Sequence, residues 1–228
     1  MRSRPYISIF RAPADGRDEE LLRLAARFGL LEIAHVMQAL RVGRTSAYRR
    51  VAELTEAGLL DRVPPLRRGP ALVRATREGL RYAGVPAMPV ALPRPGEVAH
   101  CLRCAALAIG LEADLAGDGE LLSERELTLA ERVEGRPIAS APFTGHGRQM
   151  LHRPDLAIVS PDRVVAVELE LSIKAPRRLE QIVRAWRRAS HVAEVRYLCG
   201  SPGVRRAVGR AVAAAYAEEK VHVGELPG

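Results

Sequence analysis

The stretch at 153–174, RPDLAIVSPDRVVAVELELSIK, constrains the fold more than any other part of the chain. Two short apolar runs flank a Ser-Pro-Asp sequence at 160–162, a combination that predicts two β-strands joined by a tight turn. Side chains alternate across a strand, so Glu168 and Glu170 lie on one face of the second strand. Neighbouring carboxylates repel each other, and Mg²⁺ would offset that cost because it binds carboxylate oxygens. The stretch therefore predicts an acidic site, with Asp155 opening the first strand.

Pro154-Asp155, followed thirteen positions later by Glu168-x-Glu170, resembles the motif of the PD-(D/E)xK nuclease superfamily. The resemblance implies a nuclease-like α/β fold, with Asp155 and Glu168 as Mg²⁺ ligands. It also implies a catalytic set for a metal-dependent DNA endonuclease, made of Asp155, Glu168, Glu170 and Lys174. Glu170 stands where the family has Lys, and Lys174 supplies the missing ammonium if it turns back toward the site. Because the Lys position is altered, the sequence leaves open whether the site cleaves DNA or is an inactive relative.

The net charge of +8 comes from the N-terminal part of the chain. Residues 1–96 contain 17 Arg and 9 acidic side chains, whereas residues 97–228 contain 18 basic and 18 acidic side chains. This distribution is typical of a polyanion-binding module joined to a neutral one. Three cysteines and no long apolar run predict a cytoplasmic protein without a disulfide framework or membrane span. No motif indicates a small-molecule cofactor.

The chain is predicted to be an α+β protein of two domains. We expect an N-terminal tail at 1–17, a first domain at 18–84, a linker at 85–97 and a second domain at 98–228. The segment GVPAMPVALPRPGE, which includes this linker, has four prolines and is either a semi-rigid linker or a strap along one domain.

In the first domain, apolar periodicity predicts helices at 18–29, 31–40 and 44–58, with a Gly-containing turn before the third. Thr45 or Ser46 is expected to cap the third helix. Two strands then flank a loop at 64–70, and Thr76 is expected to cap a short last helix. This order resembles a winged helix-turn-helix domain, whose third helix enters the major groove of double-stranded DNA. A winged helix that binds protein instead remains the alternative.

Exposed residues early in the third helix and at the loop tip are the predicted DNA contacts: Arg44, Thr45, Ser46, Tyr48, Arg49, Arg50, Arg67 and Arg68. The helix residues are expected to meet base edges, except that Tyr48 could pack instead. The two loop arginines are expected to contact phosphate or the minor groove.

In the second domain, the pattern predicts a helix at 98–116, a strand at 121–129 and an irregular or hairpin segment at 132–150 before the acidic strands. A basic helix at 176–190, a strand, a helix and a last short strand follow. His100-Cys101-x-x-Cys104 is interpreted as small buried side chains on a helix rather than a metal or redox site, because no second pair of metal ligands accompanies it.

A winged helix, a Pro-rich connection, SERELTLAERVEGRP, RPDLAIV and VAVELELSIK together resemble the replication-relaxation proteins of plasmids and other mobile elements. The resemblance implies DNA binding, as a homodimer, in replication, mobilisation or transcription control. It does not by itself imply catalysis.

Overall fold

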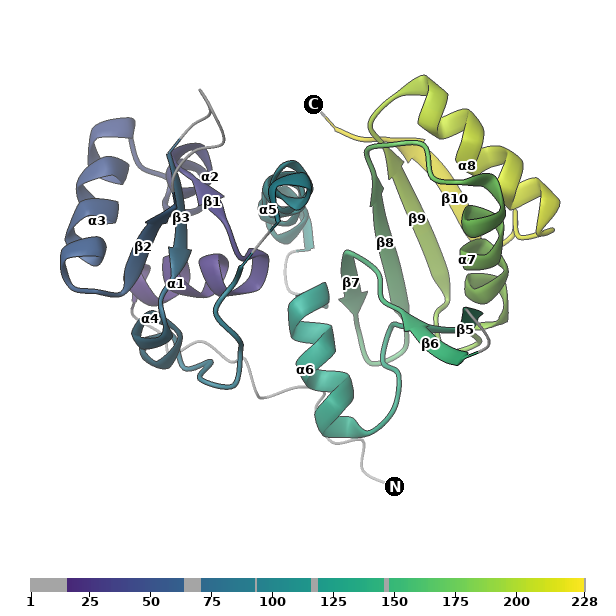
Figure 1. The fold of residues 1–228 in the computed structure, drawn as a ribbon, viewed down its shortest axis with the longest axis horizontal. Helices are drawn as coiled ribbons and strands as arrows, with labels where there is room; N and C mark the ends of the chain where they lie inside the picture. The colour runs from purple at the N-terminus through teal and green to yellow at the C-terminus, as the bar shows by residue number, and fades with distance from the viewer. Residues whose placement is uncertain (1–15, 64–70, 93, 116–118, 146–147, 228) are drawn as a thin grey trace. The chain divides into compact units, whose positions relative to one another are not determined.

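The computed structural model describes residues 16–63, 71–92, 94–115, 119–145 and 148–227. The chain divides into two compact units, residues 1–114 and 115–228. Each unit contains helices and strands, so the predicted α+β class is confirmed (Figure 1). Within the described residues, no helix combines the length and the apolar character that a membrane span requires.

The first unit combines helices with a small antiparallel sheet. Its elements are α1 (Arg17–Phe28), β1 (Leu31–Glu32), α2 (Ile33–Leu40), α3 (Arg44–Glu56), β2 (Leu60–Val63), β3 (Leu72–Ala75) and α4 (Arg77–Tyr82). Strand β3 lies between β1 and β2. The apolar stripe of α1, which includes Leu21 and Leu22, is buried in the core of this unit. Thr76 caps α4 as predicted, since its hydroxyl accepts a hydrogen bond from the Gly79 N–H (3.0 Å).

Two local predictions in this unit were wrong. The pattern began the second helix at Leu31, but Leu31 pairs with Val73 of β3 and belongs to a strand. The N-cap of α3 is Gly43, with no side-chain hydrogen bond, rather than Thr45 or Ser46. Both hydroxyl residues therefore lie within the first turns of the helix, where they are not engaged in capping.

The Pro-rich segment after α4 lies against the first unit as a strap. Met88 and Ala91 are buried, and their carbonyls accept hydrogen bonds from Arg77 (3.4 Å) and Arg74 (3.1 Å). A 3-10 turn, Pro95–Glu97, then leads into α5 (Val98–Leu115). The two units divide after α5 rather than at the segment predicted as a linker, and α5 is tied to α1 by the Arg27–Glu112 ion pair (2.5 Å).

The second unit is built on a five-stranded sheet in the order β10-β9-β8-β7-β4. Its elements are β4 (Glu120–Ser123), α6 (Glu124–Glu134), β5 (Ala141–Gly145), β6 (Arg148–His152), β7 (Leu156–Val159), β8 (Val164–Glu170), α7 (Pro176–Arg188), β9 (Glu194–Cys199), α8 (Pro202–Ala214) and β10 (Val221–Glu225). Strands β4, β7 and β8 are antiparallel, and β8, β9 and β10 are parallel. Strands β5 and β6 form a separate hairpin.

The predicted strand at 121–129 was wrong from Glu124 onward. The strand ends at Ser123, whose hydroxyl accepts a hydrogen bond from the Glu126 N–H, while the Glu126 carboxylate accepts from the Ser123 N–H (2.8 Å). This capping box starts α6. The apolar residues that follow Ser123 are therefore the buried stripe of a helix.

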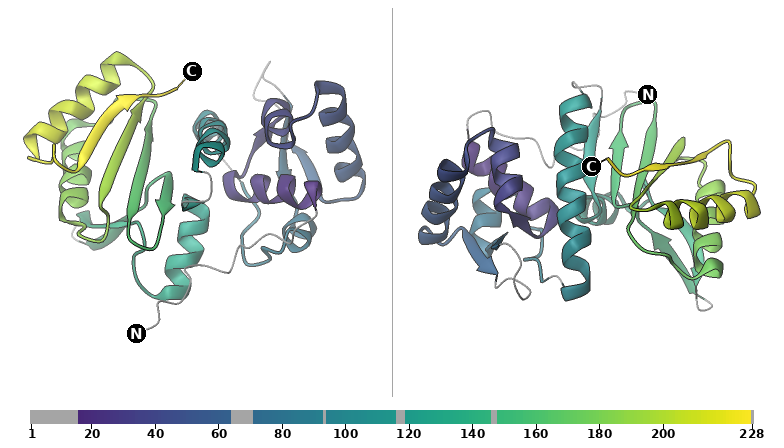
Figure 2. Two further views of the ribbon diagram at one scale, coloured as in Figure 1. Left: turned by 180° about the vertical axis from the view of Figure 1, so that it is seen from behind. Right: turned by 90° about the horizontal axis from the view of Figure 1, so that it is seen from above.

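Helices α7 and α8 cover one face of the five-stranded sheet, as Figures 1 and 2 show from different sides. This arrangement follows from topology, because the two β-α-β crossovers of β8, β9 and β10 share one hand. The core beneath them includes Trp186 and Tyr197, both nearly inaccessible. The C-terminal end of β8, which carries the predicted acidic residues, lies at the edge of this core.

Candidate functional site

The strand pair β7–β8 brings the predicted acidic residues together. Leu156 pairs with Val167, so Asp155, one position earlier, lies beside Glu168. The Oδ2 of Asp155 accepts a hydrogen bond of 2.7 Å from the backbone N–H of Leu169, which fixes the carboxylate against β8. The two residues predicted to hold a metal are thus neighbours in space, although thirteen positions separate them in the chain.

The buried carboxylate of Glu168 is held by two aromatic side chains. Its Oε1 lies 2.6 Å from Nε2 of His152 and accepts a hydrogen bond of 3.1 Å from the indole N–H of Trp186. The His152 and Trp186 rings meet edge to face, with their centroids 5.5 Å apart. Glu168 is only 3% exposed, and its two hydrogen-bond partners offset the free-energy cost of burying the carboxylate.

Lys174 turns back toward the acidic residues. Its ammonium lies 2.6 Å from Oε2 of Glu170, which is itself buried. Burial lowers the pKa of Lys174, but the carboxylates of Glu168, Glu170 and Asp155 outweigh that effect and raise it. The ammonium therefore remains charged among three acidic groups.

Tyr197 adds a polar group that the sequence pattern did not single out. In the parallel register of β8 and β9 it lies opposite Glu168. Burial, and then the nearby Glu168 and Glu170 carboxylates, raise the pKa of its hydroxyl well above the usual value. A side-chain hydrogen bond with Trp186 acts in the opposite direction and lowers the pKa of this hydroxyl.

Asp155 and Glu168 offer the kind of oxygen ligand that a divalent cation prefers. Mg²⁺ requires hard oxygen ligands, and one oxygen each from Asp155 and Glu168 would satisfy the protein's share. A bound cation would supply Lewis acidity toward a phosphate oxygen and lower the pKa of a water molecule. Lys174 and His152 would at the same time reduce the net negative charge that attracts the cation.

His152 is expected to make the stability of the second unit depend on pH. Burial lowers its pKa, but Glu168 outweighs this and raises the pKa above the ordinary value of about 6.5. The ion pair therefore stabilises the fold fully below about pH 6.5, and this contribution is lost as the pH rises through the higher folded pKa. The stability of the second unit at each pH can be measured by urea unfolding in metal-free buffer. The signal is the fluorescence of Trp186, the one tryptophan of the chain.

In the wild type, the urea concentration at the midpoint of unfolding should decrease as the pH rises from about 6 to about 9. In His152→Gln this midpoint should change less over the same pH range. His222→Gln, at an exposed position on β10, is the matched control and should keep the wild-type profile. Equal profiles for His152→Gln and the wild type would contradict the role of this ion pair.

The predicted DNA-contact residues on α3 fall into two groups. Arg44, Thr45, Tyr48 and Arg49 are exposed, whereas Ser46 is half-buried. The Arg44 guanidinium lies over the Tyr48 ring, 5.7 Å from its centroid. The side chain of Arg49 is 75% exposed and only loosely paired with Glu53 (3.8 Å). These side chains project from the face opposite the buried stripe of the helix.

Arg50 is placed differently from its neighbours. Its guanidinium pairs with Asp18 of α1 and with Glu53 of α3 (2.9 Å). Arg50 thus ties α3 to α1 in addition to lying near the predicted contact surface. The predicted wing residues Arg67 and Arg68 lie outside the described residues, as does the predicted tail up to residue 15.

Comparison with known proteins adds little to this geometry. No protein-family model matches the chain, and no curated protein matches it. Among solved structures it is similar to protein VC1899 from Vibrio cholerae, with a TM-score of 0.33 and 11% sequence identity. That alignment covers 93% of this chain and 54% of the other, so this chain spans about half the length of VC1899. A similarity this low defines neither a fold nor a family.

Proposed function

We propose that this protein binds double-stranded DNA through its first unit, and that this unit is a winged helix. The element order supports the proposal: a helix, a short strand, two helices joined by a short turn, and a hairpin, with β3 in the middle of the sheet. In domains of this kind the third helix enters the major groove and the hairpin contacts the backbone. Here the third helix is α3.

The observation that carries the proposal is the exposed arginine surface of α3. Arg44 and Arg49 project into solvent, with Tyr48 beside them, while Ala47, Val51 and Leu54 fix the opposite face in the core. Arginine presents a planar fork that suits both phosphate and guanine edges. The surrounding charge has the same sign, because residues 1–96 hold 17 Arg against 9 acidic side chains.

Arg50 acts in this proposal as a positioning residue rather than a base contact. Its ion pairs with Asp18 and Glu53 hold the middle of α3 against α1. The position of α3 on the domain decides which of its side chains reach the groove. Loss of Arg50 would therefore affect DNA binding through the orientation of the helix.

Replacing Arg44 and Arg49 together by glutamine is expected to weaken binding to a duplex of about 30 base pairs by about 10- to 100-fold at low salt. The slope of log K against log salt should fall by up to about 0.9 for each phosphate that is no longer neutralised. Fluorescence anisotropy with a labelled duplex over a range of salt concentrations measures both quantities. The control is Arg81→Gln with Arg94→Gln, two exposed arginines on and after α4. Equally weakened binding in the two double variants would rule out α3 as the DNA-contacting helix.

We propose that the second unit is a PD-(D/E)xK-like domain that serves assembly or recognition of DNA structure. From β7 onward the unit has two strands, a helix, a strand, a helix and a last strand, which is the order that the sequence pattern predicts. The wider role would be replication, mobilisation or transcription control in a plasmid or other mobile element, with the protein acting as a homodimer. This role rests on the sequence resemblance to replication-relaxation proteins.

A second candidate function is metal-dependent hydrolysis of DNA at the acidic site. The specific observation in its favour is Lys174, which reaches Glu170 and lies among the three carboxylates although the motif's own lysine position holds a glutamate. In this function Asp155 and Glu168 would hold Mg²⁺, which would activate water and polarise the phosphate. Glu170 would orient the attacking water, and Lys174 would stabilise the negative charge that develops on phosphate oxygens.

A further inference from the structure

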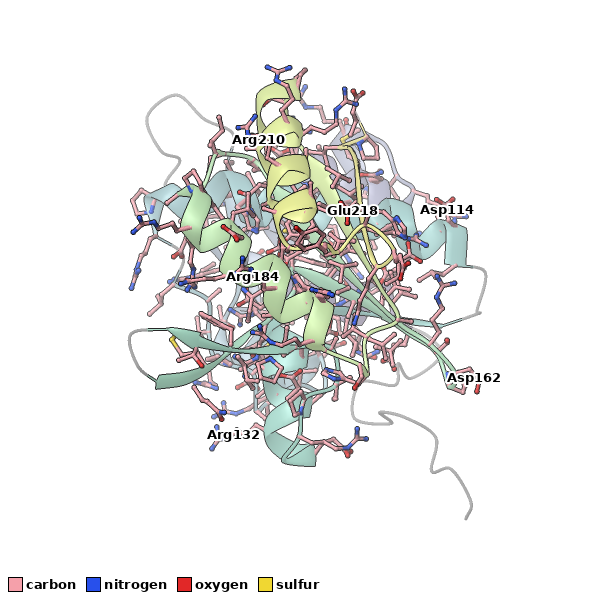
Figure 3. The ribbon with its side chains drawn as sticks, turned by 90° about the vertical axis from the view of Figure 1, so that its right-hand side faces the viewer. Asp114, Arg132, Asp162, Arg184, Arg210 and Glu218 are labelled. Carbon is pink, nitrogen blue, oxygen red and sulfur yellow. The ribbon has the colours of Figure 1, made fainter. Side chains whose placement is uncertain are left out.

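The outer face of the second unit concentrates arginine. Together α7 and α8 carry eight arginines and one acidic residue, Glu180. We call this surface the Arg face, and it consists of Arg177, Arg178, Arg184, Arg187, Arg188, Arg205, Arg206 and Arg210, all of them exposed. Figure 3 looks onto this side of the unit, with Arg184 on α7 and Arg210 on α8 labelled.

The packing of the two helices explains why the arginines gather there. Each helix buries one apolar stripe against the sheet, for example Ile182 and Trp186 on α7, and Val204 and Val208 on α8. Because both helices cover the same face of the sheet, their opposite sides form one outer surface (Figures 1 and 3). The whole unit is close to neutral, with 17 basic and 15 acidic side chains in residues 115–228. The Arg face is therefore a local separation of charge.

Half of the Arg face makes no ion pair, carbonyl hydrogen bond or aromatic contact within the described part of the chain. Arg184 pairs with Glu180, Arg205 with Glu225, and Arg187 donates to the Ala215 carbonyl. Arg178 lies over the Phe143 ring, 4.6 Å from its centroid. The remaining four make no such contact with a described residue: Arg177, Arg188, Arg206 and Arg210. Like charges on one surface repel, so an external polyanion would relieve an unfavourable arrangement.

Two further features suit a nucleic acid. Tyr216, directly after the carbonyl that Arg187 contacts, is 78% exposed and offers an aromatic ring beside the arginines. Arg188 borders a cavity of about 500 Å³ between α7 and the β5–β6 hairpin, lined also by Thr144 and Gln149. A guanidinium, a hydroxyl and an amide are groups that commonly bind phosphate and sugar oxygens.

We propose that the Arg face binds a second segment of double-stranded DNA. The length of α7, 13 residues or about 20 Å, matches the rise of about six base pairs. A lipid surface fits less well, because an interfacial helix presents a large apolar face to the membrane and the apolar faces of α7 and α8 are buried in the core. The idea that one chain holds two duplexes at once rests on the proposed DNA binding by α3.

The test uses the full chain on a bead-bound duplex and measures capture of a second, labelled duplex from solution. Replacing Arg177, Arg188, Arg206 and Arg210 by glutamine removes four charges without breaking any internal ion pair among the described residues. This variant should still bind the bead duplex, but capture of the second duplex should fall about tenfold or more, with a shallower salt dependence. The control is Arg132→Gln with Arg136→Gln, at exposed positions on and just after α6, which should capture normally.

The possible failures are distinguishable. Unchanged capture by the Arg-face variant would overturn this proposal and leave binding by α3 untouched. Loss of all duplex binding in the Arg-face variant, together with normal binding in the Arg44→Gln, Arg49→Gln variant, would instead overturn the function proposed for α3. Unlabelled duplex, hairpin RNA and vesicles containing phosphatidylserine are then compared as competitors of the second duplex. If the RNA or the vesicles displace it more strongly than the unlabelled duplex does, the Arg face binds a different polyanion and the proposal is wrong.

Discussion

Replacing Glu131 by alanine is expected to lower the free energy of unfolding of the second unit by about 3–5 kcal/mol. Glu131 lies on α6 and its side chain is only 2% exposed. Its carboxylate accepts hydrogen bonds from the backbone N–H groups of Ile138, Ala139 and Ser140, from the Ser140 hydroxyl (2.7 Å) and from Arg153 (3.2 Å). Alanine would leave all of these donors buried or half-buried without their acceptor, and unpaired buried groups cost more than their hydrogen bonds contribute.

Urea unfolding followed by Trp186 fluorescence isolates this effect, since the one tryptophan of the chain lies in the second unit. Glu134→Ala is the matched control, because Glu134 is exposed on the same helix and pairs only loosely with Arg136 (3.7 Å). The control should change stability by no more than about 0.5 kcal/mol. Glu131→Gln, which keeps one acceptor oxygen, should fall between the two. A destabilisation by Glu131→Ala no larger than that by Glu134→Ala would show that the carboxylate does not organise the segment at 138–140.

Most helices and strands could be predicted because local patterns determine them. The alternation and the turn at 160–162 specify β7 and β8, and the period of Leu179, Ile182 and Trp186 specifies α7. The errors occurred where two patterns overlap. An apolar run after Ser123 is compatible with a strand, and only the hydrogen bonds between Ser123 and Glu126 decide for a helix. The Ser-x-x-Glu spacing was present in the sequence and was the signal that could have corrected the prediction.

The sequence could predict those site residues that lie close together in the chain, but not their partners from distant segments. Asp155, Glu168, Glu170 and Lys174 share one strand pair and the loop after it, so their spacing predicts their proximity. The partners of Glu168 come from elsewhere: one ring from the β5–β6 hairpin, one from α7, and the nearby hydroxyl of Tyr197 from β9. The positions of these three side chains next to Glu168 depend on strand register and helix packing, which a short sequence motif does not specify.

The same limit applies to α3. Its exposed face followed from the helical period, but the ion pair between Arg50 and Asp18 joins residues 32 positions apart. From sequence spacing alone, Arg49 and Arg50 are both predicted to contact DNA. The structure separates them, because Arg49 remains extended toward solvent while Arg50 holds two carboxylates.

Asp155→Asn and Glu168→Gln are each expected to reduce any Mn²⁺- or Mg²⁺-dependent cleavage of supercoiled plasmid by at least about a hundredfold. Both changes keep the size of the side chain while removing the charge that would hold the cation. Lys174→Met should reduce cleavage as well, through removal of the ammonium that lies among the carboxylates. Glu134→Gln, at an exposed position on α6, is the control and should cleave as the wild type does. Trp186 fluorescence in urea checks that each variant is folded.

Binding of a cation can be measured without cleavage. Trp186 donates its indole N–H to Glu168, so Tb³⁺ held by that carboxylate would lie close enough to the indole to be excited through it. Sensitised Tb³⁺ emission should appear in the wild type and should decrease when Mn²⁺ competes with Tb³⁺ for the site. It should be abolished in Asp155→Asn and Glu168→Gln. Emission without plasmid cleavage would mean that the acidic site holds a cation but does not hydrolyse DNA. Absence of both would indicate a structural cluster in which Lys174, and His152 when it is protonated, are the counter-charges of the buried acids.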